Sequence, residues 1–286
     1  MSEVANTAVF NEVVASAEKL PPFPDVVRKV MPLIQQMVPV RSIEEVIRLD
    51  QVITAKVLAM SQSAYYSRGR AIRSLRDAIV TLGQRQLIQV IMAACAAQFF
   101  SGKTAGYDLR EGELWQHAVA TAIMAEKVAT RIGHKDILTA YTAGLLHDIG
   151  KTVLHQYVKA YFDLIVNAIR SRQLRFIDAE REILGIDHQQ LGAIIAKRWR
   201  FPGEVVSAIG HHHQPQEAHE HRDVVAVVYV ANRMVSGMGI GCGVDGFFQP
   251  NQDDIFTELG ITSRMVEAFM AETLEDLEGT RQFLAA

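Results

Sequence analysis

The sequence predicts an all-α fold, and two observations carry that prediction. Apolar residues recur every three or four positions through most of the 286-residue chain, which is the period of a helix with one buried face. Runs of alternating apolar and polar residues, the pattern of half-buried strands, are scarce. Because 49% of the residues are hydrophobic and 21% are charged, the composition is that of a globular chain rather than a disordered one.

Charge and cysteine content indicate the setting in which the chain works. The formal net charge of −3 gives no global signal for nucleic acid or for an anionic membrane surface. The two cysteines, Cys95 and Cys242, lack the spacing of a metal or redox motif, which favours a reducing cytoplasm. No signal-peptide pattern opens the sequence, and the apolar runs are too short or too interrupted to cross a bilayer. We therefore expect a cytoplasmic protein without a membrane partner.

The first part of the chain, residues 1–105, is expected to form an N-terminal helical subdomain. A proline-rich corner at residues 21–24 leads into a helix, and two more helical runs follow. Ser42 and Ser74 each stand three positions before an acidic residue near the start of one of these runs, which predicts capping boxes. Gly83 is expected to interrupt the last run.

The segment 101–112 is rich in glycine and charge and marks the boundary to a second domain, residues 106–240, expected to be a metal-binding helical bundle. Helices are expected there near residues 113–131, 136–148, 152–172, 176–185, 187–200, 203–212 and 222–237. Residues 241–286 are expected to be a glycine-rich loop and an acidic helical tail. The apolar residues of that tail would dock on the bundle or form a homodimer contact.

Possible metal ligands recur at the ends of these expected helices. His147 and Asp148 close an apolar run that Asp136 is expected to cap. Gly150 is expected to end that helix as its C′ residue. His117 lies among small residues, which allow two helices to approach closely.

Two further expected helices add imidazoles. His188 lies near the start of the helix expected at 187–200, and His211–His213 lie at the end of the helix expected at 203–212. A carboxylate with several imidazoles is a suitable ligand set for Fe, Mn or Zn. A single helical histidine is more often a hydrogen-bonded core or surface residue. The prediction of a metal site therefore rests on the joint pattern, and histidines that only pack and hydrogen-bond remain the alternative.

With these residues identified, the chain resembles the HD superfamily of helical metal-dependent phosphohydrolases, and specifically its HDOD branch. The resemblance covers roughly residues 15–240 and rests on an ordered series of motifs. They are "LPPFP", the run from "IEEVIRLDQ" to "VTLG", "LWQHAVATA", "LLHDIGK", "DHQQLGAIIAKRW" and "AIGHHHQP". The resemblance implies an HD-type helical bundle with an N-terminal HDOD helical subdomain.

The resemblance also implies a divalent transition metal, Fe, Mn or Zn, in a site of one or two ions. Motif matching gives one subsite His117, His147 and Asp148. It gives the second subsite Asp148, as a bridge, with His188, His212 and His213. Lys151 matches a lysine that faces a phosphate in related enzymes, so Asp148 and Lys151 are the residues expected to carry any catalysis.

Two departures from the superfamily pattern count against catalysis. Asn232, in "VVYVANRM", stands where the superfamily closes its first metal site with an aspartate. The Gly-Tyr-Pro segment of the HD-GYP phosphodiesterases, which cleave cyclic di-GMP, is replaced by "QPQEAHEHRD". These departures favour a non-catalytic role and lower the expectation of cyclic di-GMP hydrolysis.

Two functions remain open at this point. The first is a bacterial signal-transduction module of the HDOD type, with a partly degenerate metal site that binds metal or a nucleotide-like ligand and regulates partners. The second is an active metal-dependent phosphohydrolase or phosphodiesterase with a dinuclear His/Asp site. The expected partners are signalling proteins or a phosphate-containing small molecule.

A basic run raises nucleic-acid binding as a further alternative. Its arginines lie on more than one helix face, and no aromatic residues are interleaved within the run, so a solvated face is preferred and no nucleic-acid partner is expected. The arginines concerned are Arg68, Arg70, Arg73 and Arg76.

Overall fold

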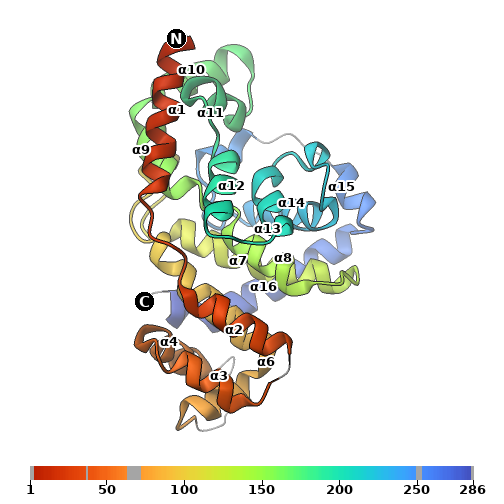
Figure 1. Ribbon diagram of the computed structural model, residues 1–286. Helices are drawn as coiled ribbons and strands as arrows, with labels where there is room; N and C mark the ends of the chain where they lie inside the picture. The colour runs from red at the N-terminus through yellow and green to blue at the C-terminus, as the bar shows by residue number, and fades with distance from the viewer. Residues whose placement is uncertain (1–2, 37, 63–71, 249–252, 285–286) are drawn as a thin grey trace. The chain divides into compact units, whose positions relative to one another are not determined.

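The computed structural model describes residues 3–36, 38–62, 72–248 and 253–284. The regular elements of these residues are helices, with an isolated β-bridge between Thr104 and Leu109, so the predicted all-α class is confirmed. Figure 1 shows the course of the chain. The chain divides into two compact units, one of Met1–Pro22 and Phe99–Met270, the other of Phe23–Gln98 and Ala271–Ala286.

The larger unit contains most of the described helices. They are α1 (Glu3–Glu18), α7 (Glu113–Arg131), α8 (Ile137–Leu146), α9 (Lys151–Ala160), α10 (Phe162–Arg172), α11 (Phe176–Leu184), α12 (His188–Arg198), α13 (Gly203–His211), α14 (Arg222–Gly237), α15 (Asp253–Glu258) and the first part of α16 (Ser263–Leu284). Short 3-10 turns lie at Ala105–Tyr107, Pro215–Glu217 and Val244–Phe248.

At the centre of this unit α7 packs against α8 and α14, and α13 packs against α8, α12 and α14 (Figure 1). Small residues set the closest of these approaches. A Cβ atom on Gly144 of α8 would lie 2.9 Å from the carbonyl oxygen of Thr121 on α7, nearer than a real Cβ tolerates. The crossing of α7 and α8 therefore depends on glycine, and it brings the side chains of both helices to one point.

The N-terminal helix α1 belongs to the larger unit and packs against α9, α11 and α12. Ser16 Oγ lies 2.8 Å from the Tyr157 hydroxyl, and Arg198 donates to the carbonyl oxygen of Ala17 at 2.9 Å. The Trp199 indole donates to the carbonyl oxygen of Pro21 at 3.0 Å. The domain limits of the sequence analysis, at residues 105 and 240, stay predictions.

The smaller unit has α2 (Asp25–Gln35), α3 (Val40–Ile47), α4 (Gln51–Gln62), α6 (Leu75–Ala96) and the end of α16. Ser74 caps α6, since its hydroxyl accepts from the backbone N–H of Asp77 at 3.0 Å. Gly83 interrupts α6 as expected, with φ 71° and ψ 176°.

The cap predicted at Ser42 is wrong. The helix begins two residues earlier, at Val40 after Pro39, and no side chain caps it. The fixed φ of proline starts the first turn there, so Ser42 already lies inside the helix. Of the basic run, Arg73 and Arg76 lie in the smaller unit, while Arg68 and Arg70 fall outside the described residues.

One helical stretch in the described residues, Leu75–Phe99, is long and apolar enough to cross a membrane by length and composition alone. Within the protein 67% of its most apolar window is buried. A core helix meets the same criterion, so this stretch is weak evidence for a membrane.

Gly150 does not end α8 as a left-handed C′ residue, which corrects the sequence expectation. Its φ of −61° and ψ of −31° are right-handed, and α9 begins at the next residue. The glycine serves close packing instead. A Cβ atom on it would collide with the carbonyl oxygen of His188 and lie 2.9 Å from the backbone nitrogen of Gly192, in the first turns of α12.

The substitution Gly150→Ala should lower the free energy of unfolding by about 2–3 kcal/mol, because the atoms in the way belong to a helix backbone that cannot move aside cheaply. Urea unfolding of the full chain measures this change. Gly210→Ala, on α13, is the matched control, since its Cβ would lie at an ordinary 3.4 Å from Ala193 Cβ on α12. Equal stability of the two variants would contradict the packing role of Gly150.

Candidate metal centre

Four helices bring the predicted ligands to one buried place. His117 lies on α7, His147 and Asp148 follow α8, His188 opens α12, and His212 and His213 follow α13. Each sits where its helix begins, ends or crosses another, so side chains far apart in sequence converge. His147, Asp148, His188 and His212 are fully buried, His117 is 3% exposed, and His213 is partly buried.

The two oxygens of Asp148 face different histidines. Oδ2 lies 3.7 Å from His117 Nε2 and 3.4 Å from His147 Nε2, and we call this group the first subsite. Oδ1 lies 3.7 Å from His188 Nε2 and 3.5 Å from His212 Nε2. With His213, whose Nε2 lies 3.1 Å from His188 Nε2, these atoms form the second subsite. In each subsite the donor atoms lie within 4.8 Å of one another.

Four of the five imidazoles, those of His117, His147, His188 and His212, are anchored through the ring nitrogen that faces away from Asp148. A backbone or side-chain oxygen accepts from each Nδ1–H, which leaves Nε2 directed into the cluster, as in metal sites of proteins. The acceptors are Ile240 O for His117 at 2.8 Å, Gly144 O for His147 at 2.7 Å, Ile209 O for His212 at 2.8 Å and Glu180 Oε2 for His188 at 2.7 Å.

Glu180 is a site residue that the sequence analysis missed. Its carboxylate is fully buried, and it accepts from the ring and the backbone N–H of His188 and from the Tyr107 hydroxyl at 2.5 Å. It thereby fixes both the ring and the first turn of α12. The sequence held one usable signal, an acidic residue on the apolar face of the helix before "DHQQ", but nothing in that pattern names its partner.

Several buried polar atoms of the cluster have no hydrogen-bond partner among the described residues. They are His147 Nε2, Asp148 Oδ1 and His212 Nε2. An unsatisfied buried acceptor costs about 1–3 kcal/mol, so such groups need another partner. A cation in the second subsite would satisfy Asp148 Oδ1 and His212 Nε2, and one in the first subsite would satisfy His147 Nε2. A carboxylate oxygen with several imidazole nitrogens is a donor set for a divalent transition metal. The residues present therefore fit a metal ion.

The protonation states agree with this fit for most of the histidines. Burial lowers the pKa of His117 to about 4 and that of His212 to about 3, and it lowers the pKa of His213 well below the usual range. These rings are neutral near pH 7 and keep a free lone pair. Burial alone would raise the pKa of Asp148, but His147 and Lys151 hold it well below its ordinary value, so the carboxylate is ionised.

His188 is the exception. Burial alone would lower its pKa, but the Glu180 carboxylate outweighs burial and raises it. A doubly protonated His188 donates to Glu180 through Nδ1 and to His213 through Nε2, at 3.1 Å. A metal ion in the second subsite would take the place of the proton shared by these two rings.

Asn232, on α14, closes the first subsite in the position where the resemblance implied an aspartate. Its Oδ1 lies 3.0 Å from His117 Nε2 and 3.3 Å from the Ser236 hydroxyl. An amide oxygen carries no charge to offset a cation. Lys151 also donates to Asp148 Oδ2 at 2.7 Å, the oxygen that this subsite uses. The first subsite is therefore electrostatically poorer than the second.

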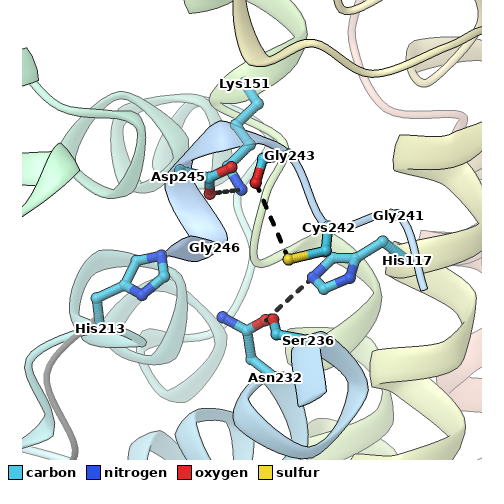
Figure 2. Close-up of a pocket in the computed structure, with 10 residues that line it drawn as sticks. All are labelled: His117, Lys151, His213, Asn232, Ser236, Gly241, Cys242, Gly243, Asp245 and Gly246. Carbon is cyan, nitrogen blue, oxygen red and sulfur yellow. Dashed lines mark hydrogen bonds and ion pairs between the residues drawn. The ribbon is translucent and has the colours of Figure 1, made fainter. Parts of the chain in front are cut away.

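Asp245 is the second residue that the sequence analysis missed, because it lies in the glycine-rich loop assigned to the C-terminal tail. Its Oδ2 accepts from Lys151 Nζ at 2.7 Å, and both side chains are buried (Figure 2). Lys151 is thus held between two carboxylates, which raise its pKa against the effect of burial. The loop covers a small cavity lined by His117, His213 and Asn232 among others (Figure 2).

These pKa values predict how acid affects the metal-free protein. Because the folded-state pKa values of His117 and His212 lie below 6.5, the unfolded chain binds more protons as pH falls from about 6.5 to 4. The free energy of unfolding should fall over that range by about 1.4 kcal/mol per pH unit for each such histidine. Urea unfolding in EDTA at several pH values measures the slope. His117→Gln should remove about one histidine's share, and a flat profile in the parent chain would contradict the prediction.

Comparison with known proteins identifies the family. A family model described as the HDOD domain matches residues 20–215. An uncharacterized protein of Treponema pallidum is 24% identical over an alignment of 197 positions that covers 65% of this chain and 36% of that protein. Ribonuclease Y of Thermus thermophilus is 34% identical over 103 residues, or 36% of this chain and 13% of that enzyme. The chain therefore spans much less than two thirds of the length of these relatives.

Solved structures share the fold over nearly the whole chain. An HDOD domain protein from Geobacter sulfurreducens is 26% identical with a TM-score of 0.72, covering 99% of this chain and 96% of that one. A candidate signal transduction protein from Marinobacter aquaeolei is 20% identical with a TM-score of 0.74, covering 98% and 66%. A candidate phosphohydrolase from Shewanella amazonensis is 21% identical with a TM-score of 0.69, covering 94% and 97%. Since the family model matches well over half of it, this chain belongs to the HDOD domain family.

Proposed function

We propose that this chain is a bacterial signalling module that binds one divalent transition metal ion tightly, in the second subsite. The observation that carries the proposal is the buried Oδ1 of Asp148, which has no hydrogen-bond partner among the described residues and faces Nε2 of His212 at 3.5 Å. His188 and His213 complete the donor set. Nitrogen and carboxylate donors suit Fe, Mn or Zn.

The residues around the second subsite prepare it for an ion. Glu180 holds the His188 ring, and the Ile209 carbonyl holds the His212 ring, so Nε2 of both is already directed at Asp148 Oδ1. Such anchoring lowers the entropic cost of assembling the ligands. A bound ion would supply positive charge in the pocket, able to polarise an oxygen of an anionic ligand.

The first subsite is proposed to bind a second ion weakly. Asn232 contributes no negative charge there, and Lys151 places an ammonium group 2.7 Å from the carboxylate oxygen that a first-subsite ion needs. Two ions 3.5–4 Å apart are the usual arrangement of a dinuclear hydrolase, as a rough guide. Loss of the second ion would leave a site that binds ligand without efficient hydrolysis, which is why we favour signalling.

In this proposal the chain acts in the cytoplasm on separate signalling proteins, and a phosphate-containing small molecule is its ligand. The name of the Marinobacter aquaeolei neighbour, a candidate signal transduction protein, agrees with that role. Neither nucleic acid nor membrane is a proposed partner. A homodimer contact through the C-terminal helices stays a prediction.

A metal-dependent phosphohydrolase or phosphodiesterase is the second candidate function. The donor set of the second subsite favours this candidate, and so does Lys151 on the other oxygen of Asp148. The names of ribonuclease Y and of the phosphohydrolase neighbour agree with it. Asp148 would hold the ions and Lys151 would bind phosphate oxygens. Turnover of cyclic dinucleotides, nucleotides, phosphodiesters or RNA by the metal-loaded chain would establish it, and binding without turnover would favour the signalling role.

The substitution Asp148→Asn should abolish tight metal binding, because it removes the oxygen charge that both subsites share. We expect about one Mn, Fe or Zn per parent chain by elemental analysis and titration, and less than a tenth of that in the variant. Asp163→Asn, which changes an exposed carboxylate on α10, should bind like the parent. A parent chain that resists loading with all three metals would refute the proposal.

The substitution Asn232→Asp should raise the affinity for a second ion by about tenfold or more, since it adds a carboxylate to the first subsite. Calorimetric titration should then resolve two ions where the parent shows one. The exposed Asn167→Asp on α10 adds the same charge away from the site and should leave the stoichiometry at one. Two equally tight ions in the parent chain would contradict the proposed difference between the subsites.

A further inference from the structure

Asp245, which lies after α14 in the chain, forms a buried ion pair with Lys151. The carboxylate comes from the short turn Val244–Phe248, and its Oδ2 accepts from Lys151 Nζ at 2.7 Å. The ammonium group already has a carboxylate partner, since Asp148 Oδ2 lies at the same 2.7 Å. Each of the two paired side chains, Lys151 and Asp245, is only 6% exposed. An anion from solvent therefore cannot reach Lys151 while Asp245 stays in place.

The loop that carries Asp245 lies tightly on the bundle through glycines. A Cβ atom on Gly241, where φ is 55°, would collide with the Glu113 carbonyl oxygen and lie 2.8 Å from His117 Cβ. One on Gly243 would lie 2.5 Å from the Tyr107 carbonyl oxygen. The cavity left beneath the loop is about 10 Å³, which is the room of one water molecule and too small for a phosphate.

We propose that Asp245 is an internal competitor for an anion subsite at Lys151. Its carboxylate takes the place of a phosphate-type oxyanion, and the ligand binds when the loop at residues 241–246 moves off the bundle (Figure 2). The chemistry favours exchange, because a phosphate group offers Lys151 more charge and more acceptor oxygens than a carboxylate does. The inference rests on the proposed function, in that it assigns a phosphate-bearing ligand to the same site.

The test compares inorganic phosphate binding to the metal-loaded full chain with and without the Asp245 carboxylate. If the loop leaves the subsite open in about a tenth of the molecules, the apparent Kd is about tenfold above its intrinsic value. Calorimetry should therefore show that Asp245→Ala binds phosphate about tenfold more tightly than the parent. Asp254→Ala, which removes an exposed carboxylate of α15, should bind like the parent.

A second measurement reports the loop itself. The backbone N–H of Gly246 donates to the Gly243 carbonyl oxygen at 3.0 Å, so its hydrogen exchange is a probe of the closed turn. Saturating phosphate should speed exchange in the parent at residues 241–246, and Asp245→Ala should exchange fast without phosphate.

Unchanged or weaker phosphate binding by Asp245→Ala would overturn the competitor role, and so would loss of its metal, because Asp245 would then hold the ion. Metal content is measured first in every variant. If no variant and no parent chain takes up metal, the proposed function fails. The same phosphate comparison on metal-free protein then still decides the role of Asp245, since Lys151 is present in both.

Discussion

The burial of the Asp148 carboxylate is the constraint on which the site depends. Moving such a charge out of water costs several kcal/mol even after a protein relaxes around it, so compensating groups must surround it. Lys151 meets one oxygen at 2.7 Å, and four imidazole nitrogens face the two oxygens at 3.4–3.7 Å. Oδ1 has no hydrogen-bond donor among the described residues, whereas Oδ2 accepts from Lys151. This difference between the two oxygens is the physical basis for a single preferred ion beside Oδ1.

The packing of the larger unit serves this arrangement. Gly144 lets α7 and α8 cross closely, and Gly150 lets the start of α9 lie on the backbone of His188. Backbone carbonyls at helix ends, such as that of Ile209, then hold the rings through Nδ1. The helix packing that stabilises the fold therefore also sets the tautomer and the ring orientation of the histidines proposed as ligands. A small change in helix spacing would misplace several donors together.

Sequence reasoning identified the fold class, the family and the histidines that converge, because helical period and ordered motifs are local signals. It failed where the reason is tertiary. Gly150 has a right-handed backbone and is glycine because of a neighbouring helix, which no C-cap rule reveals. Glu180 and Asp245 act on residues 8 and 94 positions away, and their partners become visible only when the helices are assembled. The ligand roles themselves stay proposals.

The most direct measurement of the central claim is anomalous X-ray diffraction from crystals of the metal-loaded chain, recorded at the absorption edge of the metal. We expect one strong peak within bonding distance of Asp148 Oδ1 and of Nε2 on His188 and His212, with Lys151 still on the other carboxylate oxygen. A peak confined to the His117 side of Asp148, or no peak in the cluster, would contradict it.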